Sequence, residues 1–196
     1  MISAIVLAAG MSRRMGRPKL LLPLGDELVI QRVVRTVMSS AVDETIVVVG
    51  HRRAEMEEAL THFHVRVVYN PDYAQGEMLS SIQAGLRAAS LQAAAALIVL
   101  GDQPGIPSTV IDRIVATLRE HSDRICLPTY GGRRGHPIGL PRRFWPEVLA
   151  LGWDASLRDV IRNHQANIVE VAVPDEAILM DMDTPEDYEW VIGRLE

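Results

Sequence analysis

Short apolar runs alternate along this chain with stretches whose apolar residues recur at helical spacing. The runs 44–49 (ETIVVV) and 95–100 (AALIVL) are apolar almost throughout, whereas 28–39 has apolar residues three and four positions apart. Strands that are apolar on both faces are typical of a parallel sheet covered by helices on both sides. The pattern therefore predicts an α/β fold with a mostly parallel sheet and helices on both faces.

The same reading places each element along the chain. We expect strands at 3–8, 44–49, 65–69, 95–100, 124–128 and 168–173, and helices at 28–39, 53–61, 77–89, 108–121, 156–164 and 185–195. The glycine- and proline-rich segment 131–141 is expected to form a loop or hairpin, and 131–155 to be an insertion that carries substrate contacts. In open α/β sheets, ligands bind beyond the carboxyl ends of the strands, so the loops after residues 8 and 100 should meet in one crevice.

Composition limits the classes of function. A chain of 196 residues with 48% hydrophobic residues fits a single domain, 1–196, with a substantial core. Its net charge of -5 argues against broad attraction to nucleic acid or acidic membranes. The single cysteine, Cys126, can form no internal disulfide and is expected in the core. The apolar start lacks preceding basic residues and is too short to span a bilayer, so we expect a cytoplasmic protein without nucleic-acid or membrane partners.

Residues 7–24 (LAAGMSRRMGRPKLLLPL) place a cation-rich loop directly after the first expected strand. Gly10 lets the backbone approach a ligand closely, and successive backbone N–H groups in such a loop bind anions. The donors around it are Ser12, Arg13, Arg14, Arg17 and Lys19, the last being the only lysine in the chain. The spacing fits neither a P-loop nor a dinucleotide-binding fingerprint. Phosphate binding is nevertheless favoured, and a solvent-exposed basic loop is the alternative.

Two carboxylates are candidates for holding a divalent cation. Asp102 follows the strand 95–100 directly and would stand at the mouth of the crevice. Asp183 lies in the segment MDMDTPED, where alternation places it on the same side of an extended chain as Asp181. The alternatives are turn chemistry for Asp102 and capping of the last helix by Asp183 or Thr184. Whether Asp181 shares the metal role is left open.

Two further motifs could contact the rest of a substrate. The segment NPDYAQG leads to Ser80 and Ser81, whose hydroxyls could read the polar edge of a base or simply start a helix. Arg133 and Arg134 lie in GGRRGHP, which suits a second anionic ligand or forms a solvent-exposed hairpin. No activated nucleophile is evident. A phosphate-binding loop with acidic sites on strand ends favours phosphoryl or nucleotidyl transfer, which needs positioning and charge neutralisation.

The motifs LAAGMSRRMGRPKLLLPL, GDQP, RGHPIGL and DMDTPEDY resemble, in this order and over almost the whole chain, those of the MobA-like nucleotidyltransferases. Within that family the chain is most similar to the molybdenum cofactor cytidylyltransferase branch. The resemblance implies a Rossmann-like fold of the nucleotide-diphospho-sugar transferase type, with Mg²⁺ as cofactor. It also implies attack of an acceptor phosphate on the α-phosphorus of a nucleoside triphosphate, with release of pyrophosphate. The LAAG start looks more like the cytidine branch, so the expected substrates are CTP and molybdopterin, with a molybdoenzyme as partner.

The resemblance also implies roles for residues of this chain. The implied catalytic residues are Arg14, Lys19 and Asp102, and the implied Mg²⁺ ligands are Asp102 and Asp183. The implied nucleotide-binding residues are Leu7, Ala8, Ala9, Gly10, Arg14, Lys19, Gly76, Ser80, Ser81 and Asp102, and those facing the acceptor are Gly135, His136 and Pro137. Two alternatives stay open. One is guanylyl or uridylyl transfer to another phosphorylated acceptor, and the other is a non-catalytic accessory protein of cofactor maturation.

Overall fold

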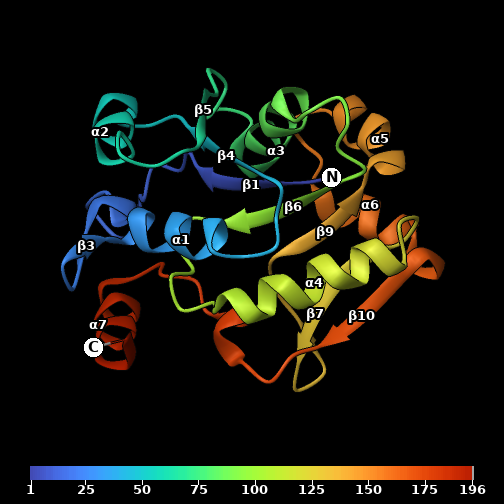
Figure 1. Ribbon diagram of the computed structural model, residues 1–196. Helices are drawn as coiled ribbons and strands as arrows, with labels where there is room; N and C mark the ends of the chain where they lie inside the picture. The colour runs from blue at the N-terminus through green and yellow to red at the C-terminus, as the bar shows by residue number, and fades with distance from the viewer. Residues whose placement is uncertain (196) are drawn as a thin grey trace.

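The computed structural model describes residues 1–195 and consists of a central sheet between two layers of helices (Figure 1). The strands are β1 (Ile2–Ala8), β2 (Pro23–Leu24), β3 (Glu27–Leu28), β4 (Glu44–Val49), β5 (Arg66–Tyr69), β6 (Ala95–Leu100), β7 (Ile125–Tyr130), β8 (Arg133–Arg134), β9 (Ile138–Pro141) and β10 (Ile168–Ala172). The α-helices are α1 (Val29–Met38), α2 (Arg53–Ala59), α3 (Glu77–Ala88), α4 (Ser108–Glu120), α5 (Trp145–Ala150), α6 (Leu157–Asn163) and α7 (Pro185–Leu195). Short 3₁₀ helices occur at η1 (Lys19–Leu21), η2 (Arg142–Phe144), η3 (Gln165–Asn167) and η4 (Glu176–Leu179).

The main sheet has the order β10–β7–β9–β6–β1–β4–β5, with β8 paired to β7, while β2 and β3 form a separate small hairpin. β1 pairs in parallel with β4 on one side and with β6 on the other. Alternate residues of these strands face opposite layers. Ile5 and Ile98 join the core under α3, α5 and α6, and Val6 and Val99 join the core under α1, α4 and α7. Burial on both faces confirms the predicted α/β fold and explains why these strands are apolar throughout.

Residues 131–155 contribute β9 and α5 to the core of the fold, so the expectation of an insertion is wrong. β9 lies between β6 and β7 and runs antiparallel to both. Leu140 in β9 and Val148 in α5 are fully buried. A Cβ on Gly139 would come within 2.9 Å of Leu118 in α4, so glycine is needed where this helix crosses β9. The predicted loop or hairpin over 131–141 is a hairpin in its first part, where Gly131 and Gly132 connect β7 to β8, and 138–141 forms β9 instead.

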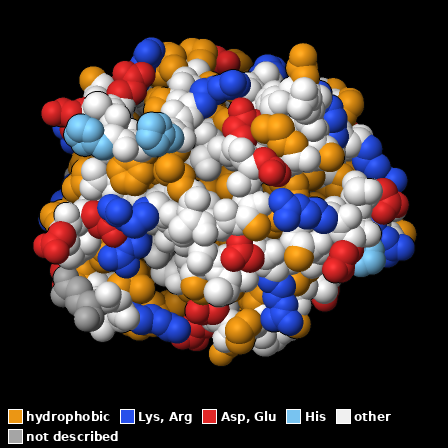
Figure 2. Space-filling view, viewed as in Figure 1, with side chains coloured by type: hydrophobic (Ala, Val, Ile, Leu, Met, Phe, Trp, Pro, Cys, Tyr) orange, Lys and Arg blue, Asp and Glu red, His pale blue; other side chains and the backbone are white. Residues whose placement is uncertain are grey.

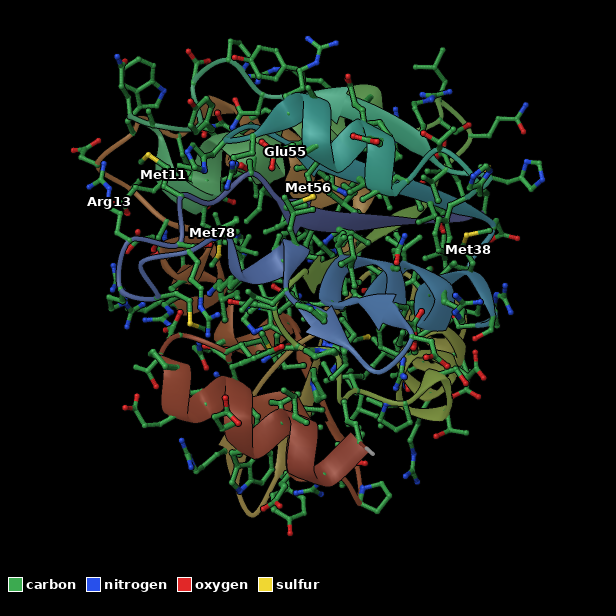
Figure 3. The ribbon with its side chains drawn as sticks, turned by 90° about the vertical axis from the view of Figure 1, so that its left-hand side faces the viewer. Met11, Arg13, Met38, Glu55, Met56 and Met78 are labelled. Carbon is green, nitrogen blue, oxygen red and sulfur yellow. The ribbon has the colours of Figure 1, made fainter. Side chains whose placement is uncertain are left out.

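The carboxyl ends of β1 and β6 lie at the same edge of the sheet, at the left of Figure 1. The loop that follows β1, the segment that follows β6 and the start of α7 all lie at this edge. Figure 3 views the molecule from that side. The parallel topology therefore brings together the loops that carry the candidate site residues.

The remaining expectations about core and surface concern Cys126 and membranes. Cys126 is buried in β7, and burial raises the pKa of its thiol to about 12, as fits a core residue. Among residues 1–195, none of the helices has the length and apolar character needed to cross a bilayer. Figure 2 shows basic and acidic side chains mixed over the face that carries α1 and α4.

α3 packs closely on β1 at Gly85, where an added Cβ would collide with the side chain of Ile5. We expect Gly85→Ala to lower the free energy of unfolding by about 1–3 kcal/mol, the usual effect of overpacking a core. Urea denaturation would measure it. Gly193→Ala in α7 is the control, because a Cβ there meets nothing within 4 Å and should stabilise the helix by about 0.5–1 kcal/mol. Unchanged stability of the Gly85 variant would contradict this packing.

Candidate active site

A cleft of about 420 Å³ opens at the carboxyl edge of the sheet. Its lining comes from the loop after β1, the start of α3, the end of β6 and the segment before α7. The predicted site residues that line it are Leu7, Ala9, Gly10, Arg14, Lys19, Ser81, Asp102 and Asp183. Ala8, by contrast, is fully buried at the end of β1. The structure thus gathers the loop cations and both predicted metal ligands around one cavity.

Lys19 lies at the centre of the charged part of this cleft. Its Nζ donates to Asp102 Oδ2 at 2.5 Å and to Asp183 Oδ1 at 2.9 Å. Its backbone N–H donates to Ser12 Oγ at 3.2 Å, which fixes the start of η1 to the preceding loop. The side chain is only 15% exposed. Burial acts to lower the pKa of Lys19, but Asp102 and Asp183 outweigh it, so the pKa is raised and the ammonium stays charged.

The Asp183 carboxylate is available because other side chains cap α7. Asp187 Oδ2 accepts hydrogen bonds from the backbone N–H groups of Asp183 (3.0 Å) and Thr184 (2.8 Å), and Thr184 Oγ1 accepts one from Asp187 (3.2 Å). Thr184 therefore provides the cap, and Asp183 does not. Asp183 Oδ2 instead pairs with Arg14 Nη2 at 2.7 Å, and the Arg14 side chain is 75% exposed. Because most of its side chain is exposed, Arg14 can leave this ion pair and turn toward a ligand.

Asp102 is held beside Asp183 by the backbone. Its carbonyl accepts a hydrogen bond from the Met182 N–H at 3.2 Å, which ties the end of β6 to the segment before α7. Glycine precedes it because a Cβ on Gly101 would lie 2.7 Å from the Leu7 carbonyl oxygen. Two carboxylates therefore converge on one cation.

This donor set fits Mg²⁺, which proteins commonly bind through one or two carboxylates together with substrate phosphates. Asp102 and Asp183 supply two hard oxygen ligands facing a cleft that has room for more. Within residues 1–195, no cluster of three or more His, Cys, Asp or Glu side chains forms a metal cage. The arrangement therefore suits an ion that arrives with phosphate better than one held by protein alone.

Asp181 lines the same cleft but has a different partner. Its Oδ1 accepts a hydrogen bond from Gln103 Nε2 at 2.7 Å. Burial and the neighbouring charge of Asp102 raise the pKa of Asp181. Asp183 therefore pairs with Lys19, whereas Asp181 pairs with Gln103. The sequence could not distinguish these two acids, and the structure gives them different partners.

Of the residues predicted to lie beside the base, one lines the cleft and the others support the start of α3. Ser81 lines the cleft, whereas Ser80 Oγ donates to the Glu77 carbonyl at 3.0 Å and accepts from Asn70 Nδ2 at 2.8 Å inside the protein. Gly76 leaves room for this turn, since a Cβ there would collide with Ser80. Gly76 and Ser80 therefore shape the start of α3 and do not line the cavity.

Gly135, His136 and Pro137 lie outside the lining of this cleft. A Cβ on Gly135 would overlap the Ile178 carbonyl oxygen, and the His136 N–H donates to the same oxygen at 3.0 Å. Burial lowers the pKa of the His136 side chain to about 4, and the nearby Asp102 charge opposes that shift. The segment is therefore anchored to η4 and lies near Asp102, next to the cleft.

Sequence reasoning identified one side of the cleft only in part: it predicted Ser81 and the segment NPDYAQG, but not Glu77 or Met78. Residues at the start of α3 and in the turn just before it form this side, and we call them the α3 wall: Tyr73, Ala74, Glu77, Met78 and Ser81. Figure 3 shows Met78 on the same side of the molecule as Met11 and Arg13, which also line the cleft. Arg17, by contrast, lies 5.9 Å over the Tyr188 ring. An exposed methionine at a helix start has no spacing signal that would have marked it.

Comparisons with known proteins show the family to which the chain belongs. Residues 4–168 match the MobA-like NTP transferase domain. The chain is 28% identical over 188 residues to the molybdenum cofactor cytidylyltransferase of Escherichia coli (strain K12), across 95% of this chain and 93% of that protein. It is 31% identical over 198 residues to the purine catabolism protein PucB of Bacillus subtilis (strain 168), across 95% and 94%.

Solved structures show the same fold. A nucleotidyl transferase from Methanothermobacter thermautotroptrophicus is 32% identical, with a TM-score of 0.86 over 100% of this chain and 97% of that one. Rv0371C from Mycobacterium tuberculosis H37Rv in complex with manganese is 26% identical, with a TM-score of 0.83 over 98% of each chain. These likenesses support nucleotidyltransferase activity. The chain belongs to the MobA-like NTP transferase family, as its motifs predicted.

Proposed function

We propose that this chain is a Mg²⁺-dependent cytidylyltransferase that transfers CMP from CTP to the phosphate of molybdopterin and releases pyrophosphate. The observation that supports it most directly is the convergence of Lys19 and Arg14 on Asp102 and Asp183 within the cleft. The similarity to the E. coli molybdenum cofactor cytidylyltransferase supports the choice of nucleotide and acceptor.

In this proposal Lys19 binds the triphosphate without leaving the acids. An ammonium group carries three N–H donors; Asp102 and Asp183 take two of them, which leaves one for a phosphate oxygen. Arg14 is largely exposed and can direct its guanidinium at a second phosphate oxygen in the paired geometry that arginine favours. Both cations then neutralise the charge that grows on the departing pyrophosphate.

Asp102 and Asp183 would hold Mg²⁺, and the manganese complex of Rv0371C supports a divalent cation in proteins of this kind. When bound, the ion acts as a Lewis acid that polarises phosphoryl oxygens. The backbone of Leu7–Gly10 would contact the nucleoside, and Gly135–Pro137 would face the acceptor from beside Asp102.

The reaction needs no dedicated protein base. An acceptor phosphate oxygen forms a bond to the α-phosphorus, while the bond from that phosphorus to the bridging oxygen breaks and pyrophosphate leaves with the electron pair. A phosphate monoester has a second pKa of about 6 and is already anionic near pH 7. Binding both phosphates in line and neutralising their charge is therefore the main task of the site. We further infer that the chain works as one domain in the cytoplasm and passes its product to a molybdoenzyme.

A comparison of nucleotides tests this proposal. With Mg²⁺ present, CTP at about 100 times its Kd should raise the melting temperature by roughly 5–10 °C, and GTP, ATP and UTP should raise it less. Pyrophosphate release with purified molybdopterin should then require CTP. A larger shift with GTP or UTP would favour a different nucleotidyl transfer, and nucleotide binding without any pyrophosphate release would favour an accessory protein.

A further inference from the structure

Glu77 is the acidic residue of the cleft that the proposed phosphate site does not use. The other acids have partners: Asp102 and Asp183 hold Lys19, and Asp181 accepts a hydrogen bond from Gln103. Within residues 1–195, the structure gives the Glu77 carboxylate no hydrogen bond or ion pair, although it lines the cleft. A carboxylate next to a site for a polyanion needs a reason, because it repels phosphate.

Glu77 enters the cleft from the start of α3, whereas Asp102 and Asp183 enter it from the end of β6 and the segment before α7. β6, which leads to Asp102, flanks β1 on one side, and β4 flanks it on the other. α3 begins at Glu77 and packs over β1, β4 and β5. A triphosphate bound at Lys19 and Arg14 therefore leaves its nucleoside to extend across the end of β1 toward the α3 wall.

The backbone holds Glu77 in an unusual conformation. Its φ is +46°, in the left-handed region that non-glycine residues adopt uncommonly. The Glu77 carbonyl accepts the Ser80 hydroxyl at 3.0 Å, and Asn70 in turn donates to Ser80 at 2.8 Å. Backbone strain of this kind persists where the surroundings enforce it, and it clusters at ligand sites. These hydrogen bonds therefore hold the segment that carries Glu77 at the wall of the cleft.

The neighbours of Glu77 suit a flat apolar group. Tyr73 and Met78 line the cleft beside it, and Met78 is 51% exposed. Met11 and Arg13 also line the cleft, with Arg13 Nη2 3.8 Å from Met11 Sδ, and Figure 3 shows both on the same side of the molecule as Met78. Thioether sulfur packs favourably on aromatic rings. This end of the cleft therefore offers apolar surfaces and one free acceptor, which match a base better than a ribose.

We propose that the Glu77 carboxylate accepts a hydrogen bond from the exocyclic amino group of the nucleobase and so selects an amino-bearing base, such as cytosine, against uracil. An ionised carboxylate is an acceptor only. Cytosine presents an N4 amino donor, whereas uracil presents the O4 acceptor at the same position, as thymine does. Uracil would thus face Glu77 acceptor to acceptor. The inference rests on the proposed function for the position of the triphosphate.

Nucleotide binding measured by calorimetry tests the proposal without an acceptor. Wild-type protein with Mg²⁺ should bind CTP more tightly than UTP. Glu77→Gln keeps the size of the side chain but can donate to O4, so it should reduce the CTP-to-UTP affinity ratio by about 10- to 100-fold, the usual contribution of a hydrogen bond to a charged group. The ratio of CTP to 2′-deoxy-CTP should not change. Glu58→Gln is the matched control, because Glu58 is exposed on α2 and lies outside the cleft lining.

Three outcomes would overturn the role of Glu77. They are equal binding of CTP and UTP by the wild type, an unchanged ratio in Glu77→Gln, or a change in the deoxyribose ratio alone, which would assign the carboxylate to the ribose. Glu77→Gly guards against misfolding, since it relieves the left-handed strain and should lose the preference for CTP. Pyrophosphate release is scored separately, so a failure of transfer with intact base selection would reject the proposed function and leave the role of Glu77 standing.

Discussion

Lys19→Met is expected to lower kcat/KM by about 10²–10³-fold, the usual effect of removing one donor that stabilises transition-state charge. Methionine keeps the length of the apolar stem and removes the ammonium that bridges Asp102 and Asp183. The same change frees two carboxylates from their cation, so the nucleotide-free protein should bind Mn²⁺ more tightly than the wild type. Activity falls while metal affinity rises, a combination that simple unfolding does not produce.

The measurements are steady-state pyrophosphate release, calorimetric titration with Mn²⁺, and circular dichroism to verify the fold. Arg17→Met is the matched control, because Arg17 is a cation of the same loop that lies over Tyr188, outside the cleft lining. That variant should retain activity and metal affinity. Turnover near the wild-type level in Lys19→Met would remove the ammonium from the mechanism.

Asp102→Asn is expected to shift the Mg²⁺ dependence of the reaction to higher concentration. The amide keeps the size of the side chain and its place at the end of β6, but it removes the charge that attracts a divalent cation. Loss of even a supporting group costs a metal site roughly 10–100-fold in affinity, and a direct ligand should cost at least as much. Titration of pyrophosphate release with Mg²⁺, and of the apoprotein with Mn²⁺, would measure the shift.

Asp181→Asn serves as the comparison for Asp102. Asp181 lines the same cleft, but its oxygen is engaged by Gln103, 2.7 Å away. We expect a smaller shift in the metal titration for this variant. Curves that coincide for the wild type and Asp102→Asn would refute the proposed role of Asp102.

The strands at the centre of the sheet could be predicted from the sequence because both of their faces are buried. The expected strands 44–49 and 95–100 match β4 and β6 residue for residue. β9 was missed because Gly139 and Pro141 disfavour a strand locally, and the close approach of Leu118 in α4 and Cys126 in β7 explains the glycine. Local propensity therefore failed where packing between distant segments determined the residue.

The charged part of the site could also be predicted, because Asp102 directly follows an apolar strand and Lys19 lies in the cation-rich loop after another. The contact that aligns Asp102 with Asp183 is a backbone hydrogen bond from Met182, which no pattern of side chains reveals. Sequence could not say which of two adjacent serines faces the cleft, because the rotation of α3 depends on how Ile82 packs in the core. The role of Glu77 was missed for the same reason.

The central position of β9 has a consequence for synthesis of the chain. β6 is translated before β9 and needs residues 138–141 to complete its pairing on that side. Until those residues leave the ribosome, β6 presents an open edge that can recruit another nascent chain. β6 and β7 therefore become linked through β9 only late in synthesis. A fragment that stops at residue 130 would be prone to aggregate.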